Sequence, residues 1–299
     1  MKTIKVIALL LIVSFAFKAC ESSSSTTAPE TEPTIVEIAV GNDSFSTLVN
    51  ALSQTGLVET LSGNGPFTVF APTNEAFDNL PQGTLESLTT EQLQSILLHH
   101  VISAEVFSGD LNATQTVSAA NGEEVFITSS QGTVRVNGSS VVTTADLEAS
   151  NGVIHAVDTV ILPDAFGDLV ANASKRYFLS TLVDVIVDRG LVSALQAEGP
   201  FTVFAPTNNA FAAIADVLPT LTPEQVTNVL LYHVVPTRAL SGDLLPTQEI
   251  PTLLDGQTLT ITVENGVVSV NGNATVTSAD ANGTNGVIHV VDAVLIPEL

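Results

Sequence analysis

The chain has 299 residues, with 8 Lys and Arg against 31 Asp and Glu, and a formal net charge of −23 at pH 7. Charged residues make up 13% of the chain, about half the usual share, so the negative balance reflects a shortage of basic residues. The phosphate backbone of DNA or RNA would repel such a surface, which argues against a nucleic-acid-binding protein. The hydrophobic content of 45% also argues against intrinsic disorder, and the length suits about two domains.

Residues 1–19 have the features of an export signal. Two lysines accompany an apolar run of 12 residues, Val6 to Phe17, which is too short to span a membrane but matches the core of a signal peptide. The segment ends beside Cys20, the only cysteine of the chain. This pattern resembles a bacterial lipoprotein signal, in which the cysteine is lipidated and becomes the mature N-terminus. An ordinary secretory signal with an incidental cysteine is the alternative.

Residues 20–33 begin with this cysteine and continue as ESSSSTTAPETEP, without a large apolar residue. Ser, Thr, Pro and Glu cannot build a core, so we expect a flexible linker after a lipidated cysteine. The 13 linker residues give a mean reach of roughly 20 Å, which suits a tether between a membrane and a folded domain. An acidic chain of this kind would be repelled by anionic lipid, so we expect only the lipid to hold it at a membrane.

The rest of the chain is one domain-sized unit that occurs twice. Gly65–Asn74 (GPFTVFAPTN) recurs without a change at Gly199–Asn208, and a closing NGVIHAVD recurs as NGVIHVVD at Asn285–Asp292. A step of 134 residues (65 to 199) is far longer than the period of solenoid repeats. We therefore expect a tandem duplication, with domain 1 at residues 34–163 and domain 2 at residues 165–299.

Helical signals come first in each copy. Apolar residues at helical spacing from Phe45 to Leu52 predict a helix that ends at Gly56. A short apolar strand at 66–71 and a short helix at 76–80 should follow. A capping box then opens a helix in each copy, with Thr and Gln three residues apart. The four residues of these boxes are Thr89, Gln92, Thr222 and Gln225.

Strand signals fill the last third of each copy. In the first copy, β-rich segments at 125–128, 133–136 and 140–143 are separated by glycine turns, and residues 153–162 form a last, mostly apolar strand. Helices followed by antiparallel strands indicate an α+β fold.

Together these segments resemble the fasciclin-type domain. The resemblance is carried by FAPTNxAF at 70–77 and 204–211, by a central (Tyr/His)-His pair between aliphatic residues, and by the closing NGVIHxVD. It covers 34–163 and 165–299, and it implies two β-wedges flanked by helices. Members of this family are secreted or anchored at the cell surface and are mostly linked to adhesion. The resemblance therefore implies an exported adhesion protein that binds an extracellular or envelope protein or polysaccharide.

The resemblance also implies a binding segment. In animal members the Tyr-His pair is implicated in receptor binding, which points here to Tyr232 and His233 and, in the first copy, to His99 and His100. Tyr232 is expected at the border between core and surface, where it would anchor a partner. The alternative is that His99 and Tyr232 only plug the end of a helix. His100 and His233 extend apolar stripes and are expected to be buried structural side chains.

No pattern in the chain predicts an enzyme or a cofactor. GxSxG, HExxH and glycine-rich phosphate loops are absent from the sequence. His155 and Asp158 are three residues apart on a strand and face opposite sides, so they form no catalytic dyad. Each copy has too few histidines for a zinc site. Oxygen-bearing residues at 146–150 and 280–284 suit a polar turn better than a calcium loop. We expect no catalytic residue and no metal.

A second class of function stays open, namely a periplasmic-side lipoprotein that binds a small ligand or an envelope polysaccharide. The chain has no Trp and two Tyr, which disfavours an aromatic platform for sugars. An adhesion module should show a surface apolar patch and no deep pocket. A ligand-binding protein should show an enclosed, mostly apolar cavity with convergent polar groups.

Overall fold

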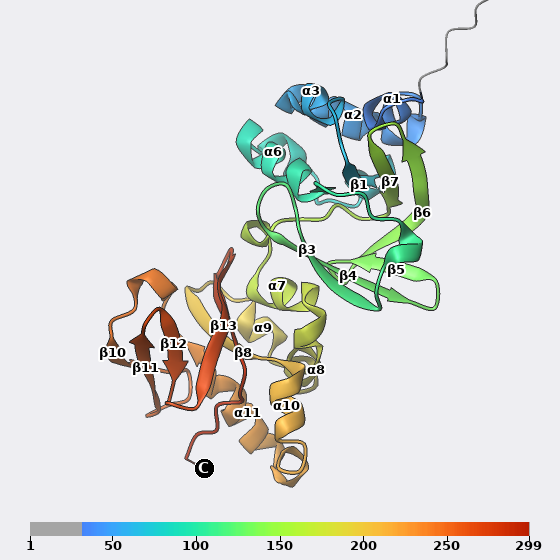
Figure 1. Ribbon diagram of the computed structural model, residues 1–299. Helices are drawn as coiled ribbons and strands as arrows, with labels where there is room; N and C mark the ends of the chain where they lie inside the picture. Colours follow the sequence, from blue (N-terminus) through green and yellow to red (C-terminus); the bar gives the residue numbers. More distant parts are fainter. Residues whose placement is uncertain (1–31, 299) are drawn as a thin grey trace, which may run out of the picture. The chain divides into compact units, whose positions relative to one another are not determined.

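Two seven-stranded sheets organise residues 32–298, the part of the chain that the computed structural model describes (Figure 1). The strand order is β2-β1-β7-β6-β5-β4-β3 in the first copy and β9-β8-β14-β13-β12-β11-β10 in the second, so both copies have the same topology. The predicted signal peptide, Cys20 and most of the predicted linker lie outside the described residues. The α+β prediction is confirmed.

The first copy contains α1 (Ile35–Val40), α2 (Ser46–Thr55), α3 (Leu57–Leu61), β1 (Phe67–Pro72), α4 (Asn74–Asp78), α5 (Thr84–Ser87), α6 (Thr90–His99), β2 (Val101–Ile102), β3 (Thr114–Ser118), β4 (Glu124–Ser130), β5 (Thr133–Val136), β6 (Ser140–Ala149) and β7 (Gly152–Val157). The second contains α7 (Leu169–Lys175), α8 (Ser180–Asp188), α9 (Val192–Leu195), β8 (Phe201–Pro206), α10 (Asn208–Ala213), α11 (Pro223–Tyr232), β9 (Val234–Val235), β10 (Thr247–Pro251), β11 (Thr258–Glu264), β12 (Val267–Val270), β13 (Ala274–Gly283) and β14 (Gly286–Val291).

Local signals explain where the main helices begin and end. Helix α2 ends at Gly56, whose φ of 71° lies in the left-handed region that glycine adopts readily. At the start of α6, the backbone N–H of Gln92 donates to Thr89 Oγ1 over 3.2 Å, and the N–H of Thr89 donates to Gln92 Oε1 over 2.9 Å. The same box opens α11 with a proline at the first position. The predicted capping boxes are therefore confirmed.

Each sheet is mixed, whereas the sequence indicated antiparallel strands. Strand β1 lies parallel to β7, with Val69 opposite Ile154, and β8 lies parallel to β14 in the same register. The remaining pairs are antiparallel. The last strand also ends earlier than expected, at Val157. The chain leaves the sheet there because Ile161 bonds to a histidine at the end of α6.

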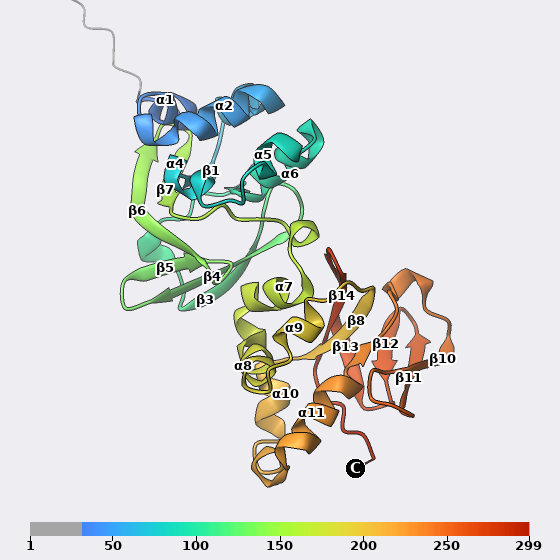
Figure 2. The same ribbon diagram turned by 180° about the vertical axis from the view of Figure 1, so that it is seen from behind.

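Each copy has apolar side chains buried on both faces of its sheet. Alternate residues of a strand point to opposite faces, so Val69 and Ala71 of β1 join the core under the helices while Phe70 joins a second core under β4 and β5. The second copy divides in the same way, and its helices α8, α10 and α11 lie on one side of its sheet (Figure 2). Burial on both faces explains why the motif strands read as unbroken apolar runs.

Candidate functional site

The second histidine of each central pair is buried and fixes two chain segments together. His100 Nδ1 donates to the carbonyl oxygen of Ile96 over 2.7 Å, and its Nε2 accepts from the N–H of Ile161 over 2.9 Å. His233 makes the same two bonds in the second copy. Because both nitrogens are used in this way, each ring must be neutral. Burial accordingly lowers the pKa of both histidines to about 4.

The preceding position differs between the copies but makes an equivalent connection. His99 Nε2 accepts from the side-chain amide of Asn137 over 3.3 Å, and the Tyr232 hydroxyl accepts from that of Asn271 over 2.9 Å. The Tyr232 hydroxyl also donates to the carbonyl oxygen of Thr258 over 3.0 Å. Asn137 lies in the turn after β5, and Asn271 lies in the equivalent turn after β12.

The side chains of the predicted binding segment are too deeply buried to contact a partner directly. The exposed fraction is 1% for His99 and 6% for Tyr232, so the expectation that Tyr232 lies at the border of core and surface is wrong. The Tyr232 ring belongs to the apolar core of the second copy, and its hydroxyl bonds to Asn271 and Thr258. His100 and His233 are buried too. That these four residues bind a partner stays a prediction, and none of them is open to direct contact in this conformation.

The histidines of the closing motif hold a bulged strand in place. His155 Nδ1 accepts from the N–H of Asp146 over 3.1 Å, and its Nε2 donates to the carbonyl oxygen of Val106 over 2.9 Å. Asp146 has a φ of 59°, and its carboxylate accepts hydrogen bonds from the N–H and hydroxyl of Ser108. Asp158 instead accepts from the N–H of Val141. The second copy repeats the histidine and Asp–Ser bonds.

The oxygen-bearing segments at 146–150 and 280–284, which we expected to be polar turns, instead lie mostly within strands β6 and β13, beginning where the strand register is shifted by a bulge. Within residues 32–298, no group of three or more His, Cys, Asp or Glu side chains is placed to hold a metal ion. Over the same residues, no helix has the length and apolar composition that a membrane crossing requires.

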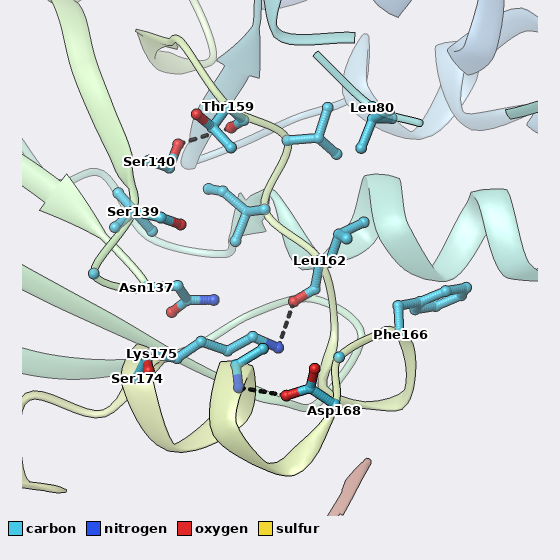
Figure 3. A pocket seen from close by; sticks show the side chains of 16 residues that line it. Leu80, Asn137, Ser139, Ser140, Thr159, Leu162, Phe166, Asp168, Ser174 and Lys175 are labelled. Carbon is cyan, nitrogen blue, oxygen red and sulfur yellow. Dashed lines mark hydrogen bonds between the residues drawn. The ribbon is translucent and has the colours of Figure 1, made fainter. Parts of the chain in front are cut away.

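Sequence reasoning missed a half-open cleft beside residues 163–167, the joining segment between the two copies (Figure 3). Its volume is about 550 Å³, and its lining is mostly apolar, with Leu80, Leu162 and Phe166 among its walls. Lys175, at the end of α7, reaches across to the carbonyl oxygen of Leu162, 2.9 Å from its Nζ (Figure 3). No single motif marks this cleft, because its walls come from Leu80, from the turn at 136–140, from residues 159–168 and from α7, which are separate in the sequence.

A buried charge cluster holds the joining segment beside this cleft. The Asp164 carboxylate accepts hydrogen bonds from Lys175, over 3.1 Å, and from Arg176. Burial raises the pKa of Asp164, but the adjacent Arg176 and Lys175 outweigh it and leave the pKa below its usual value. Burial also lowers the pKa of Lys175. The Arg176 guanidinium carbon lies 5.0 Å from the centre of the Phe126 ring, so a cation–π contact adds to the cluster.

The residues around this cluster differ between the copies. Phe126 of β4 packs edge-on against Tyr177 and Phe178, with ring centres 6.4 and 5.7 Å apart. The second copy has Thr260 at the position of Phe126, and the first copy has Asp43 and Ser44 at the positions of the two aromatic residues. The three aromatic residues that pack together here therefore have no aromatic counterpart at the equivalent positions of the other copy.

The chain belongs to the fasciclin domain family, since the sequence model of the Fasciclin domain matches residues 43–163 and 178–297. Protein sll1483 of Synechocystis is 47% identical over 143 residues, which cover 46% of this chain and 78% of that protein. Human periostin is 28% identical over 265 residues, which cover 88% of this chain and 31% of periostin. The chain thus spans about a third of periostin.

A solved structure supports the fold. The FAS1 domain pair from the insect cell adhesion molecule Fasciclin I has a TM-score of 0.65 and 19% identity, and the match covers 86% of this chain and 98% of the pair. Two FAS1 domains, each a nearly closed wedge of seven strands with helices, are therefore present in the described residues. The family is typically secreted and includes adhesion proteins such as periostin, which are not enzymes.

Proposed function

We propose that the chain is an exported adhesion protein, anchored by lipid at Cys20, whose two fasciclin domains bind an extracellular or envelope protein or polysaccharide. The observation that carries this proposal is the match of both copies to the fasciclin domain. The proposed organisation is a signal peptide at 1–19, a lipidated cysteine and linker at 20–33, and domains at 34–163 and 165–299. The apolar run before Cys20 and the polar stretch after it support the anchor.

The predicted binding residues fit this proposal only in an indirect role. His99, His100, Tyr232 and His233 tie the end of a helix to a turn and to the chain after the last strand. We therefore place the partner contact on the surface that these residues hold in shape, with the four side chains as positioning residues.

The anchor is tested with Cys20→Ser in the full chain. We expect the wild-type protein in the membrane fraction and the variant in the soluble exported fraction. Without the lipid anchor, the acidic chain would be repelled by anionic membrane lipid. The control is Ser22→Ala, which changes a neighbouring residue and should leave fractionation unchanged. Equal membrane association of wild type and Cys20→Ser would refute the anchor.

The partner is sought by capture from native envelope extract on the full chain. A lipidated chain without residues 34–299 serves as the control for binding through the lipid and linker. Envelope protein or polysaccharide retained only by the full chain supports the proposal. Equal retention by both chains would contradict a role for the fasciclin domains.

A second candidate function, binding of a small ligand, is favoured by one observation. The cleft beside Lys175 is mostly apolar and has a few polar groups, as expected of a ligand-binding protein, although it is half-open and not enclosed.

A further inference from the structure

The cleft has the dimensions and the position of a small-molecule site. Ligand sites in proteins are concave, mostly apolar and roughly 300–1,000 Å³ in volume, and they often lie where domains meet. The cleft, at about 550 Å³, falls inside this range and lies beside the segment that joins the two copies. Leu80, Leu162 and Phe166 are only partly buried and supply apolar surface for a bound molecule.

The walls of the cleft are held by bonds that do not depend on a ligand. Lys175 and Arg176 bond to Asp164 on one side. On the other side, the Ser140 hydroxyl donates to the carbonyl oxygen of Thr159 over 2.8 Å. The turn at Gly138 lies so close to α7 that an added Cβ would stand 2.7 Å from the carbonyl oxygen of Ser174. The cavity is therefore preformed, which reduces the ordering cost of binding.

Lys175 supplies the polar contact in this apolar setting. An ammonium has three N–H donors, and within the described residues Lys175 Nζ has two acceptors, the carbonyl oxygen of Leu162 and the Asp164 carboxylate. Because Lys175 lines the cleft, its third N–H is available to a group bound there. The ammonium is largely buried, with 11% of its side chain exposed, so a hydrogen bond from it would be charge-assisted and well shielded from water.

The surrounding charge decides which acceptor suits this donor. Asp164 is shared by Lys175 and Arg176, Glu123 accepts from the N–H of Asp164 over 2.9 Å, and the carboxylate of Asp168 lines the cleft, so three carboxylates surround two cations. The chain as a whole carries a net charge of −23, so a ligand with its own negative charge would be repelled. A neutral acceptor avoids that repulsion and still uses the third N–H.

We infer that this cleft binds a small, uncharged and mostly apolar molecule that carries a carbonyl oxygen, with Lys175 donating to that oxygen. The inference rests on the second candidate function and names its ligand class. It does not depend on adhesion or on the lipid anchor, so the experiments above can fail without deciding it.

The test uses the naphthyl ketone Prodan, an uncharged apolar probe whose fluorescence shifts to the blue in a dry site. The chain has no Trp to interfere with the signal. We expect saturable binding to the full chain. Ser139→Phe and Ala171→Phe, which place a ring in the cleft at exposed positions, should weaken binding at least about tenfold. Asn273→Phe is the matched control, because it alters the equivalent turn of the second copy and should leave the affinity unchanged.

Two further arms test the chemistry of the ligand. Lys175→Met keeps the apolar stem and removes the donor, so Prodan affinity should fall at least about tenfold, the value of one hydrogen bond from a charged group. The anionic probe anilinonaphthalene sulfonate should bind at least about tenfold more weakly than Prodan. Absence of saturable Prodan binding, equal binding after both cleft-filling substitutions, or tighter binding of the sulfonate would overturn the inference.

Discussion

At the residue scale, the five histidines of the chain act as links between backbone segments. Each ring uses both nitrogens, with one donating and the other accepting, and at least one bond of each ring reaches a segment far away in the sequence. Such a ring must stay neutral, because protonation would turn the accepting nitrogen into a second donor that faces an N–H group. His100 and His233, whose pKa burial lowers to about 4, therefore couple the stability of the fold to pH.

We predict that the free energy of unfolding falls as the pH drops from about 6.5 to about 4. Unfolded histidines bind protons below pH about 6.5, whereas burial lowers the pKa of His100 and His233 to about 4 in the fold. Between these two pH values the unfolded chain therefore binds protons that the folded chain does not bind. Each of the two histidines should cost about 2 kcal/mol between pH about 7.5 and about 5, measured by denaturant unfolding.

His233→Gln isolates one of these contributions. The variant is less stable at neutral pH, but its stability should fall by about 2 kcal/mol less than that of the wild type over the same interval. Most carboxylates titrate below this interval and contribute little to it. Identical pH dependence in the two proteins would contradict the assignment of His233 as a neutral buried group.

The Tyr232 hydroxyl is predicted to act on stability. Tyr232→Phe removes the group that bonds to the carbonyl oxygen of Thr258 and the side-chain amide of Asn271, so two hydrogen bonds are lost and the free energy of unfolding should fall by about 1 kcal/mol. Tyr177→Phe is the control, because within residues 32–298 that hydroxyl has a single contact, at 3.4 Å from Thr116 Oγ1. A larger loss from Tyr177→Phe, or no loss from Tyr232→Phe, would refute the prediction.

At the element scale, the helices could be predicted from local signals and the sheet pairing could not. The capping boxes and the glycine after α2 are contained within a few residues of sequence, and the structure has them as expected. The parallel pairing of β1 with β7 joins residues about 85 positions apart, such as Val69 and Ile154. Apolar strands buried on both faces have no alternation that would reveal a partner.

The motif glycines are explained by this pairing. Gly152, at the start of β7, has no room for a side chain, because an added Cβ would lie 1.9 Å from the carbonyl oxygen of Phe67 in β1. Gly152→Ala should therefore separate the paired strands and lower the free energy of unfolding by about 3 kcal/mol. Gly109→Ala is the control, since nothing lies within 4 Å of its added Cβ. Equal effects of the two changes, measured by thermal unfolding, would contradict this account.

At the scale of the whole molecule, the duplication could be predicted directly from the sequence. The cleft and the charge cluster between the copies could not be predicted. Identical motifs give identical wedges, so both copies were expected to fold alike. The cleft and the charge cluster depend on residues that the copies do not share, such as Phe126, Lys175 and Arg176. In a single sequence, such differences look like ordinary variation until the structure brings them together.

The aromatic contacts at this junction should stabilise the molecule. Phe126 is buried by Arg176, Tyr177 and Phe178, whereas Thr260 at the equivalent position of the second copy is only half-buried. Phe126→Thr gives the first copy the residue of the second, and the loss of buried apolar surface should cost about 3 kcal/mol. Protease cleavage within the joining segment should also become faster, because that segment loses one of the side chains that hold it.

Thr260→Ala provides the matched control, because it truncates the same strand position away from the junction and should cost less than about 1 kcal/mol. The unfolding free energy and the cleavage rate together separate two explanations. If the contacts hold the junction, Phe126→Thr changes both quantities and Thr260→Ala changes neither by much. If Phe126 only fills the core of its own copy, stability falls while the joining segment keeps its protection. That second outcome would refute a stabilising role for the aromatic contacts between the copies.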